Sequence, residues 1–318
     1  MSSTAHEPQI NRTVVFVSLG LALALVLAVL VGARVFYNRV ALQPVAMSEL
    51  PAPEASSPEC ASLIDALPGA LAGLKRAELA EPAPAGAAAW QSSSTERITL
   101  RCGVDLPAQY TPYSQTQDVG GAQWLRVDDA TPGSDLTTWY AVDRSPALAV
   151  TASGERSRDD EPPVADLDTS ALSALSATAP HPNPAPLADL PAAAGASGAC
   201  AELLGAAPDS IAEGYTRVAE PASPDTAAWA APGRDAIVLR CGVAAPASYR
   251  PGARLDQVNG VPWFEDVTLA NGTTASTWYA LGRTVNVAAS LPQAESNEAI
   301  TNLTNLIEAH TAKDPAAN

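Results

Sequence analysis

The sequence predicts an α+β protein in which an N-terminal transmembrane helix precedes two homologous domains. Each domain is expected to contain a mostly antiparallel sheet flanked by an N-terminal and a C-terminal helix. Two observations support this prediction. Residues 14–31 carry no charged side chain, and the stretch Leu-Arg-Cys-Gly-Val at 100–104 recurs unchanged at 239–243. The same spacing of 139 residues relates most other distinctive residues of the two copies, which indicates a tandem duplication.

The composition restricts the classes of function. A length of 318 residues suffices for two domains. Only 5% of the residues are aromatic and alanine is abundant, so we expect small cores. The formal net charge of -16 argues against nucleic acid as a partner, because nucleic-acid surfaces need clustered Lys and Arg. It equally disfavours peripheral binding to anionic lipids.

The apolar run predicts a transmembrane helix at 13–34, after a short cytoplasmic tail at 1–12. About twenty helical residues span roughly 30 Å, the thickness of a hydrocarbon core, and the run has no polar stripe. The alternative is a cleaved signal peptide, whose apolar core is normally about 7–15 residues long. We favour a retained anchor, because the run is longer and is followed by Arg34 and Arg39 rather than by a processing site.

Two signals predict opposite orientations for this anchor. Arg12 precedes the helix while Arg34 and Arg39 follow it, which favours a cytoplasmic location for the bulk of the chain. The cysteines described below favour the oxidising side of the membrane. A difference of one charge is the weaker signal, so we predict a single-pass cell-membrane protein whose bulk is extracytoplasmic.

Composition also predicts the domain boundaries. Segments 35–57 and 180–196 are rich in Pro, Ala and Ser and lack periodicity, so we interpret them as a stalk and an interdomain linker. The first repeat domain is then expected at 58–179 and the second at 197–312. A tail at 313–318 follows.

Both copies predict the same order of elements. Each opens with a short helix that ends before a proline, at Pro68 or Pro208. Alternating residues predict strands at 98–102 and 237–241. A hairpin with a type I′ turn, two further strands and a terminal helix follow. The turns are predicted by Gly120-Gly121 and Asn259-Gly260. The strands are predicted around Trp124, Trp263, Trp139-Tyr140, Trp278-Tyr279, 147–151 and 285–289. The terminal helix is predicted by Ile300, Leu303, Leu306 and Ile307, with Leu172 and Leu175 as a weaker counterpart in the first copy.

The four cysteines form one pair in each copy, Cys60 with Cys102 and Cys200 with Cys241. We predict an intradomain disulfide in each copy, in preference to free buried thiols or intermolecular bridges. Regular pairs that follow a signal-anchor are typical of oxidising compartments. The sequence has no Cys-x-x-Cys pattern and no histidine near the cysteines, so we predict no metal site.

Several of these features together resemble a known family. They are Cys60, the Leu67-Pro68 turn, Arg76, Trp90 after two alanines, the Leu-Arg-Cys-Gly-Val stretch and Trp124. They are similar to the DUF3515 family over residues 58–178, and again over 198–310. The resemblance implies a single-pass membrane protein of the actinobacterial cell envelope with an extracytoplasmic domain. It implies no biochemical function and no catalytic residue, and the presence of two copies departs from the single-domain arrangement of the family.

The sequence contains no recognisable catalytic constellation. His6, His181 and His310 lie in a tail, a linker and a terminal helix, and no phosphate-binding loop or nucleophile elbow occurs. We therefore predict no catalytic residue and no cofactor. The pairs Asp128-Asp129 and Glu265-Asp266 are interpreted as solvated strand ends, because adjacent strand residues point to opposite faces.

Four matched arginines are the candidate ligand contacts. Arg101 and Arg240 alternate with inward-facing Leu and Cys, so they face the other side of the sheet, while Arg144 and Arg283 lie in the turn between the last two strands. Arginine and tryptophan on one face would suit an anionic envelope polymer or a glycan. The alternative is cross-strand charge pairing, with the tryptophans in the core.

The sequence therefore predicts a non-catalytic envelope binding or scaffolding protein, with the membrane and an envelope protein or polymer as partners. The alternative is an envelope-acting hydrolase or transferase with an unrecognised site. Tryptophan exposure distinguishes binding from a structural role. A shared exposed patch favours ligand binding, whereas buried rings favour structure.

Overall fold

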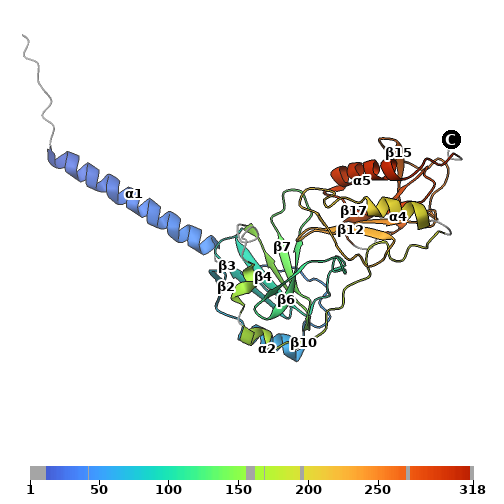
Figure 1. The fold of residues 1–318 in the computed structure, drawn as a ribbon. Coiled ribbons are helices and arrows are strands. Elements are labelled where there is room, and N and C mark those ends of the chain that lie inside the picture. The colour runs from blue at the N-terminus through green and yellow to red at the C-terminus, as the bar shows by residue number, and fades with distance from the viewer. Residues whose placement is uncertain are drawn as a thin grey trace, which may run out of the picture.

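The computed structural model describes residues 12–41, 43–154, 162–167, 169–193, 197–269 and 273–315. It begins with the helix α1 (Arg12–Ala41), which projects from the first domain on the side away from the second (Figure 1). Within α1, Arg12–Phe36 is long and apolar enough to cross a membrane, and no part of it is buried against the domains. Of the predicted tails, 1–11 and 316–318 lie outside the described residues.

Each domain contains one large antiparallel sheet, which confirms the predicted α+β class. The first sheet has eight strands in the order β1-β2-β3-β4-β9-β7-β6-β5. Their bounds are β1 (Ala70–Leu71), β2 (Leu74–Ala77), β3 (Ala87–Gln91), β4 (Arg97–Cys102), β5 (Thr116–Val119), β6 (Ala122–Asp128), β7 (Thr137–Ala141) and β9 (Leu148–Ala152). The short strands β8 (Arg144–Ser145) and β10 (Ser176–Ala177) form a separate pair.

The second sheet repeats this topology with seven strands in the order β11-β12-β13-β17-β16-β15-β14. Their bounds are β11 (Thr216–Arg217), β12 (Thr226–Ala230), β13 (Ile237–Cys241), β14 (Asp256–Val258), β15 (Val261–Glu265), β16 (Ala275–Ala280) and β17 (Val287–Pro292). A 3-10 turn, η3 (Val267–Leu269), follows β15. In both sheets the strand that carries the repeated Leu-Arg-Cys stretch is central, so its residues contact neighbours on both sides.

Helices cover one face of each sheet, which we call the helix face. In the first domain these are α2 (Pro58–Ala66), the 3-10 turn η2 (Pro163–Asp166) and α3 (Thr169–Leu172), packed over a core that includes Trp90 and Trp124. In the second domain they are α4 (Ser197–Gly205) and α5 (Ser296–His310), packed over Trp229 and Trp263. The terminal helix expected in the first copy is only the four-residue α3.

Strands β3 and β12, the neighbours of the central strands β4 and β13, were not predicted. Both are rich in alanine, Ala-Ala-Ala-Trp-Gln and Thr-Ala-Ala-Trp-Ala, and every residue in both is buried. Burial on both faces removes the alternation of apolar and polar residues that reveals a half-exposed strand, and alanine has a low strand propensity. Tertiary packing therefore decides the structure of these segments.

One predicted turn is confirmed and its counterpart is wrong. Gly120 and Gly121 both have positive φ, 59° and 77°, as a type I′ turn requires. In the second copy Asn259 has a φ of 48°, but Gly260 does not lie in the left-handed region. The second hairpin therefore turns with a different backbone conformation, although both loops contain two residues.

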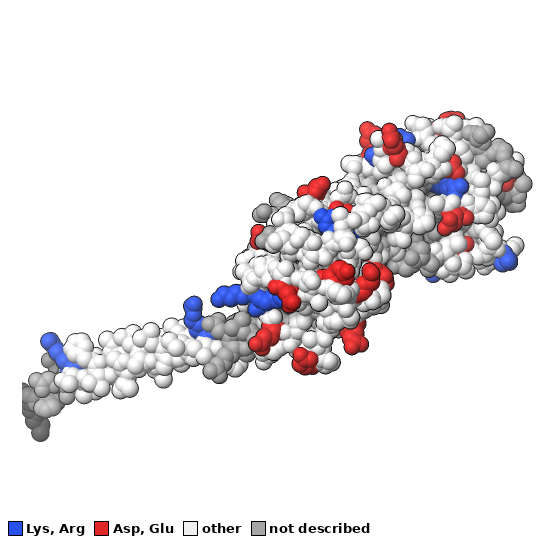
Figure 2. Space-filling view, turned by 90° about the horizontal axis from the view of Figure 1, so that it is seen from below, with Lys and Arg blue, Asp and Glu red and all other residues white. Residues whose placement is uncertain are grey.

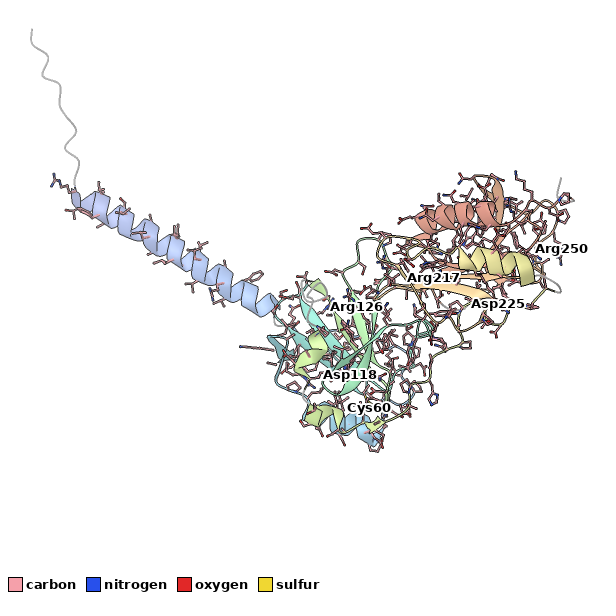
Figure 3. All side chains as sticks on the ribbon, viewed as in Figure 1. Cys60, Asp118, Arg126, Arg217, Asp225 and Arg250 are labelled. Carbon is pink, nitrogen blue, oxygen red and sulfur yellow. A yellow bond between two sulfur atoms is a disulfide. The ribbon has the colours of Figure 1, made fainter. Side chains whose placement is uncertain are left out.

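Disulfides join the first helix of each domain to its central strand, as predicted. Cys60 on α2 pairs with Cys102, and Cys200 on α4 pairs with Cys241, with Cα–Cα distances of 5.6 and 5.5 Å. Figure 3 shows Cys60 in the first domain. A bridge that closes a loop of about forty residues removes roughly 4 kcal/mol of denatured-state entropy, which is substantial for a small alanine-rich core.

The segments interpreted as a stalk and a linker are packed against the sheets. We call residues 43–57 the first strap and residues 180–193 the second strap. In the second strap, the Ala193 amide donates to the Gly242 carbonyl at 2.7 Å, and the Pro191 carbonyl accepts from the Ala244 amide at 2.7 Å. The Glu54 amide makes the equivalent bond to the Gly103 carbonyl at 3.2 Å. Each strap therefore makes main-chain hydrogen bonds to the domain that follows it.

The predicted stalk at 35–57 and linker at 180–196 are thus hydrogen-bonded to the sheets over their described parts, 43–57 and 180–193. Pro-rich chain lacks internal hydrogen bonds, so its composition resembles that of a spacer. Here its carbonyls and amides find partners on the sheets instead. The glycine of the repeated stretch permits the close approach, because a Cβ on Gly103 would lie 2.3 Å from the Ala55 nitrogen. The exact domain boundaries remain predictions.

Candidate binding cleft between the domains

The predicted ligand contact Arg240 holds the second strap. Its Nε donates to Asp225 Oδ2 at 2.9 Å, and its guanidinium also donates to the carbonyls of Leu187, Ala188 and Leu190 at 2.6, 3.0 and 2.8 Å. The Arg240 side chain is only 12% exposed. Buried charged donors are stabilised only by such a complete set of acceptors, so Arg240 has a structural partner for its charge.

Arg101 makes the corresponding contact in the first domain. Its Nη2 donates to the Ser48 carbonyl in the first strap at 2.6 Å, and Ser48 precedes Leu187 by the same 139 residues that relate Arg101 to Arg240. Burial lowers the pKa of Arg101. The repeated arginine therefore serves the same purpose twice, the attachment of a strap to the sheet face opposite the helices. We call that side the strap face.

The other two predicted contacts also have internal partners. Arg144 pairs with Asp143 at 2.8 Å and donates to the Gly121 carbonyl. Arg283 is buried and donates to Thr311 Oγ1 at 2.8 Å and to the Thr311 carbonyl, at the end of α5. None of the four arginines lines either of the two interdomain cavities described below. Their role as ligand contacts remains a prediction without geometric support.

The tryptophans do not form an exposed patch. Trp90, Trp124, Trp229 and Trp263 are fully buried, and Trp139 is 4% exposed. The indole nitrogens of the first four donate to internal acceptors, the carbonyls of Pro68, Val119 and Pro208 and the hydroxyl of Thr304. Because buried rings favour a structural role over ligand binding, we interpret these five rings as structural.

The two domains contact each other directly. Tyr113 of the first domain is 5% exposed and packs against Ala228 and Val238 on the strap face of the second sheet. The Tyr113 hydroxyl accepts a hydrogen bond from the Ala222 amide at 3.2 Å. The second strap contributes too, because the Asn183 amide donates to the Tyr110 carbonyl at 2.8 Å. These contacts tie the domains together at a point remote from the helix faces.

A main-chain hydrogen bond adds a second connection. The Asp128 amide, at the end of β6, donates to the Gly233 carbonyl at 2.8 Å, and Val127 forms a parallel bridge with Gly233. Gly233 has a φ of 75°, and a Cβ there would lie 2.2 Å from Asp128 Oδ2. Glycine is therefore required for both the turn and the close approach.

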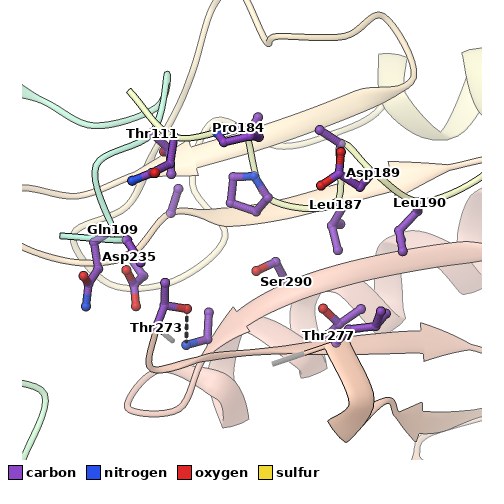
Figure 4. A pocket seen from close by; sticks show the side chains of 18 residues that line it. Gln109, Thr111, Pro184, Leu187, Asp189, Leu190, Asp235, Thr273, Thr277 and Ser290 are labelled. Carbon is purple, nitrogen blue, oxygen red and sulfur yellow. Dashed lines mark hydrogen bonds between the residues drawn. The ribbon is translucent and has the colours of Figure 1, made fainter. Parts of the chain in front are cut away.

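Two neighbouring cavities lie between these connections, and together we call them the interdomain cleft. The first-sheet cavity, about 490 Å³, lies on the strap face of the first sheet and is closed by the second domain. The second-sheet cavity, about 310 Å³, lies on the strap face of the second sheet beneath the second strap (Figure 4). Gln109 and Asp235 line both.

The two cavities occupy equivalent places in the repeat. Thr138 and Thr151 face each other across β7 and β9 in the first cavity, with their hydroxyls 2.9 Å apart. Thr277 and Ser290 hold the same register positions in the second cavity (Figure 4). Each sheet therefore offers a pair of hydroxyl-bearing residues to its cavity. The residues that close the cavities come from different elements and are not repeated.

The charges in the first-sheet cavity come from both domains. Arg126 pairs with Asp128 at 2.8 Å, and Arg234 pairs with Glu295 at 3.1 Å. Both arginines are thus matched by a carboxylate. Asp129 and Asp235 add negative charge to the same cavity, so its lining has a net negative charge. The apolar part of the wall is formed by Leu125, Val127, Leu136, Pro292 and Ala294.

The carboxyl of Asp235, which lines both cavities, has a raised pKa. Burial raises the pKa of Asp235, and the negative charge of Glu295 raises it further, while the hydrogen bond from Thr274 Oγ1 at 2.7 Å acts in the opposite direction. The adjacent Tyr215 hydroxyl donates to the Asp235 carbonyl at 3.0 Å. Arg234 covers the Tyr215 ring at 4.8 Å. The carboxyl therefore lies in a partly desolvated site with one hydroxyl donor.

The two carboxylates of the Asp128-Asp129 pair have separate partners, whereas in the second pair Asp266 is buried, so its interpretation as a solvated strand end is wrong. Asp128 accepts hydrogen bonds from Arg126 and Thr137, whereas Asp129 accepts from Thr131 and Ser134. These hydrogen bonds from Ser134 and Thr131 lower the pKa of Asp129. Among the described residues no group of three or more His, Cys, Asp and Glu side chains is placed to hold a metal ion.

The cleft is not visible in the sequence because the distinctive residues that line it are not repeated in the two copies. Arg126 corresponds to Glu265 in the second copy, and Arg234 corresponds to Thr95 in the first. A search for matched residues therefore discards both. Only the weak signal that Asp128 and Asp129 follow a strand pointed towards this region.

Fold and site together define a chain with an N-terminal apolar helix and two tandem α+β domains. Each domain contains one internal disulfide, and the two domains share a cleft. The chain belongs to the family described as "Protein of unknown function (DUF3515)", which matches residues 19–180 and again 167–316. The two matches overlap at residues 167–180. Comparisons with curated proteins and with solved structures gave no significant match.

Removal of Arg240 is expected to destabilise the second domain. Arg240→Ala removes the ion pair of Asp225 and leaves three strap carbonyls without their donor, so the free energy of unfolding should fall by roughly 2–3 kcal/mol. Chemical denaturation of the full chain in detergent measures this. Arg254→Ala, at a 90% exposed side chain, is the matched control and should change stability by less than about 0.5 kcal/mol. Unchanged stability of Arg240→Ala would contradict the strap assignment.

Asp235→Asn tests the raised pKa of Asp235. A carboxyl with a raised pKa in the folded state contributes stability that is present below its unfolded pKa and is lost as pH rises through the folded pKa. The variant should therefore gain stability over the native chain near pH 8, and this gain should vanish near pH 3, below the ordinary carboxyl pKa of about 4. Denaturation midpoints across this pH range provide the measurement.

Asp129→Asn is a control variant whose change in stability is expected to have the opposite sign to that of Asp235→Asn. The pKa of Asp129 is lowered, so its stabilising contribution is present above the unfolded pKa and is lost as pH falls. This variant should lose stability at neutral pH. Equal pH profiles for the two variants would show that the environment of Asp235 is not the one described.

Proposed function

We propose that this chain is a membrane-anchored, extracytoplasmic binding protein whose ligand occupies the interdomain cleft. The apolar helix α1 supports the anchor, since its apolar stretch is exposed along its whole length. Two disulfides support an oxidising compartment outside the cytoplasm. The disulfides thus favour an extracytoplasmic location for the domains, whereas the count of charges near the helix favours a cytoplasmic one.

The single observation that carries the binding function is the composite wall of the cleft. The first-sheet cavity takes its floor from the first domain and its closing residues from the second. A volume of about 490 Å³ lies in the ordinary range for small-ligand sites. Polar groups that converge on an apolar wall are the usual arrangement of such sites.

The lining suits a ligand with a positive charge next to an apolar portion. Arg126 and Arg234 are neutralised by their own carboxylate partners, whereas Asp235 has a single hydroxyl donor from a side chain. An ammonium or guanidinium group near Asp235 would offset the cost of burying its charge. The aliphatic wall around Leu125 and Val127 would bury the apolar portion.

Ligand-observed magnetic resonance with simple probes tests this function. The full chain in nanodiscs is mixed with hexylamine or with hexanoate, and saturation transfer from protein to probe is measured. We expect transfer to hexylamine that exceeds transfer to hexanoate several-fold, because the cavity favours the cation. Asp235→Asn should abolish most of the difference.

Asp118→Asn is the matched control, since Asp118 is an exposed carboxylate on β5 that does not line the cleft. It should leave the preference for hexylamine unchanged. Equal transfer to both probes, or an equal effect of the two variants, would contradict the proposed site. Loss of the preference for hexylamine in Asp235→Asn, but not in Asp118→Asn, would support the proposed site.

A further inference from the structure

The first domain is attached to α1 with almost no intervening chain. α1 ends at Ala41, and Gln43 already belongs to the first strap, where its carbonyl accepts a hydrogen bond from Gln91 Nε2 at 2.8 Å. Val45 is 3% exposed, and its amide donates to the Glu78 carbonyl at 2.8 Å. Figure 1 shows that α1 meets the first domain beside β2 and β3. The sheet edge therefore starts where the helix ends.

The strand register places two basic residues beside this junction. Lys75 on β2 pairs with Gln91 on β3, which pairs with Arg97 on β4. Residues paired in this way point to the same face of a sheet, so Lys75 and Arg97 flank Gln91 and with it the end of α1. Both basic side chains are exposed. Arg34, near the end of the apolar stretch, adds a third positive charge.

The nearest acidic residues in the sequence, Glu78 and Glu96, lie just outside strands β2 and β4. Arg76 on β2 points to the face opposite Lys75, and its guanidinium lies 4.9 Å from the buried Trp90 ring, on the helix face. Glu96 is also engaged, since it accepts a hydrogen bond from Ser92 at 2.6 Å. Figure 2 shows basic atoms gathered where the first domain meets α1, with acidic atoms beside them on the same domain and others farther along. Lys75, Arg97 and Arg34 thus bring three positive charges to the junction of a chain whose net charge is -16.

We propose that the first domain rests on the membrane surface, with Lys75 and Arg97 bound to the phosphate groups of anionic phospholipids. The proposal rests on the membrane anchor of the proposed function, but not on the cleft. Five helical residues separate Phe36 from Ala41, about 7–8 Å along the axis. That distance is comparable to the Debye length of about 8 Å at physiological ionic strength, so both basic residues lie within reach of the surface charge.

The expectation that net charge excludes contact with anionic lipid therefore applies to the chain as a whole and not to this junction. Charges beyond one Debye length are screened, and 14 of the 34 acidic residues lie in the second strap and the second domain. The short connection after α1 fixes the basic pair at the surface, and so no free energy is needed to bring it there. A first domain bound to the membrane surface in this way would hold the cleft at a fixed distance from the membrane.

The two lysines of the chain, Lys75 and Lys313, allow a direct test. The full chain is placed in nanodiscs of phosphatidylcholine, with or without phosphatidylglycerol, and acetylated with an uncharged succinimidyl ester. Mass spectrometry gives the rate at each lysine. We expect phosphatidylglycerol to slow acetylation of Lys75 at least threefold and high salt to restore it, while exposed Lys313, on the far domain, keeps its rate.

Charge reversal separates specific contact from the general surface potential. Arg97→Glu should remove most of the slowing at Lys75, whereas Arg254→Glu, in the second domain, should leave it intact. Inorganic phosphate added to phosphatidylcholine nanodiscs should have no effect, which distinguishes lipid from free phosphate. Equal Lys75 rates in the two lipids, or equal effects of the two variants, would overturn the proposal. A chain that does not enter nanodiscs at all would instead overturn the anchor.

Discussion

Attachment of the straps to the sheets is the interaction on which the rest of the structure depends. In each copy the repeated Leu-Arg-Cys-Gly-Val stretch makes that attachment possible. In the second copy Leu239 lies in the core, Arg240 binds strap carbonyls, Cys241 bridges to α4, and Val243 forms a bridge with Ala192. The intervening glycine turns with positive φ. Five consecutive residues thus join a helix on one face to a strap on the other, which gives a physical reason for their exact repetition.

The straps also explain why the domains form one unit with an asymmetric site. A sheet covered on both faces has no large apolar surface left, so the second strap can connect the domains while it covers the second sheet. The cavities remain where the strap faces are incompletely filled, above the pairs Thr138 with Thr151 and Thr277 with Ser290. Duplication supplied two equivalent floors. Unrepeated residues such as Tyr113, Arg126 and Asp235 then made the contacts and charges of the cleft specific.

The sequence predicted those parts of the fold that have a local signal. Alternation revealed β4 and β13, the spacing of apolar residues revealed α5, and matched cysteines revealed both disulfides. Strands β3 and β12 were hidden, since alanine buried on both faces gives no alternation. The straps were hidden because their hydrogen bonds go to residues about fifty positions away, as between Ser48 and Arg101. The cleft could not be predicted, because it exists only once two domains meet.

Amide hydrogen exchange of the second strap in the full chain tests the central claim most directly. If the strap is part of the second domain, the amides of Ala193 and Ala244 should be protected to nearly the same degree as the amides of β13, because they open only when the sheet opens. If the amides of 183–193 exchange at the rate of unstructured peptide while β13 remains protected, the strap is a free linker. That result would contradict both the shared architecture and the cleft built on it.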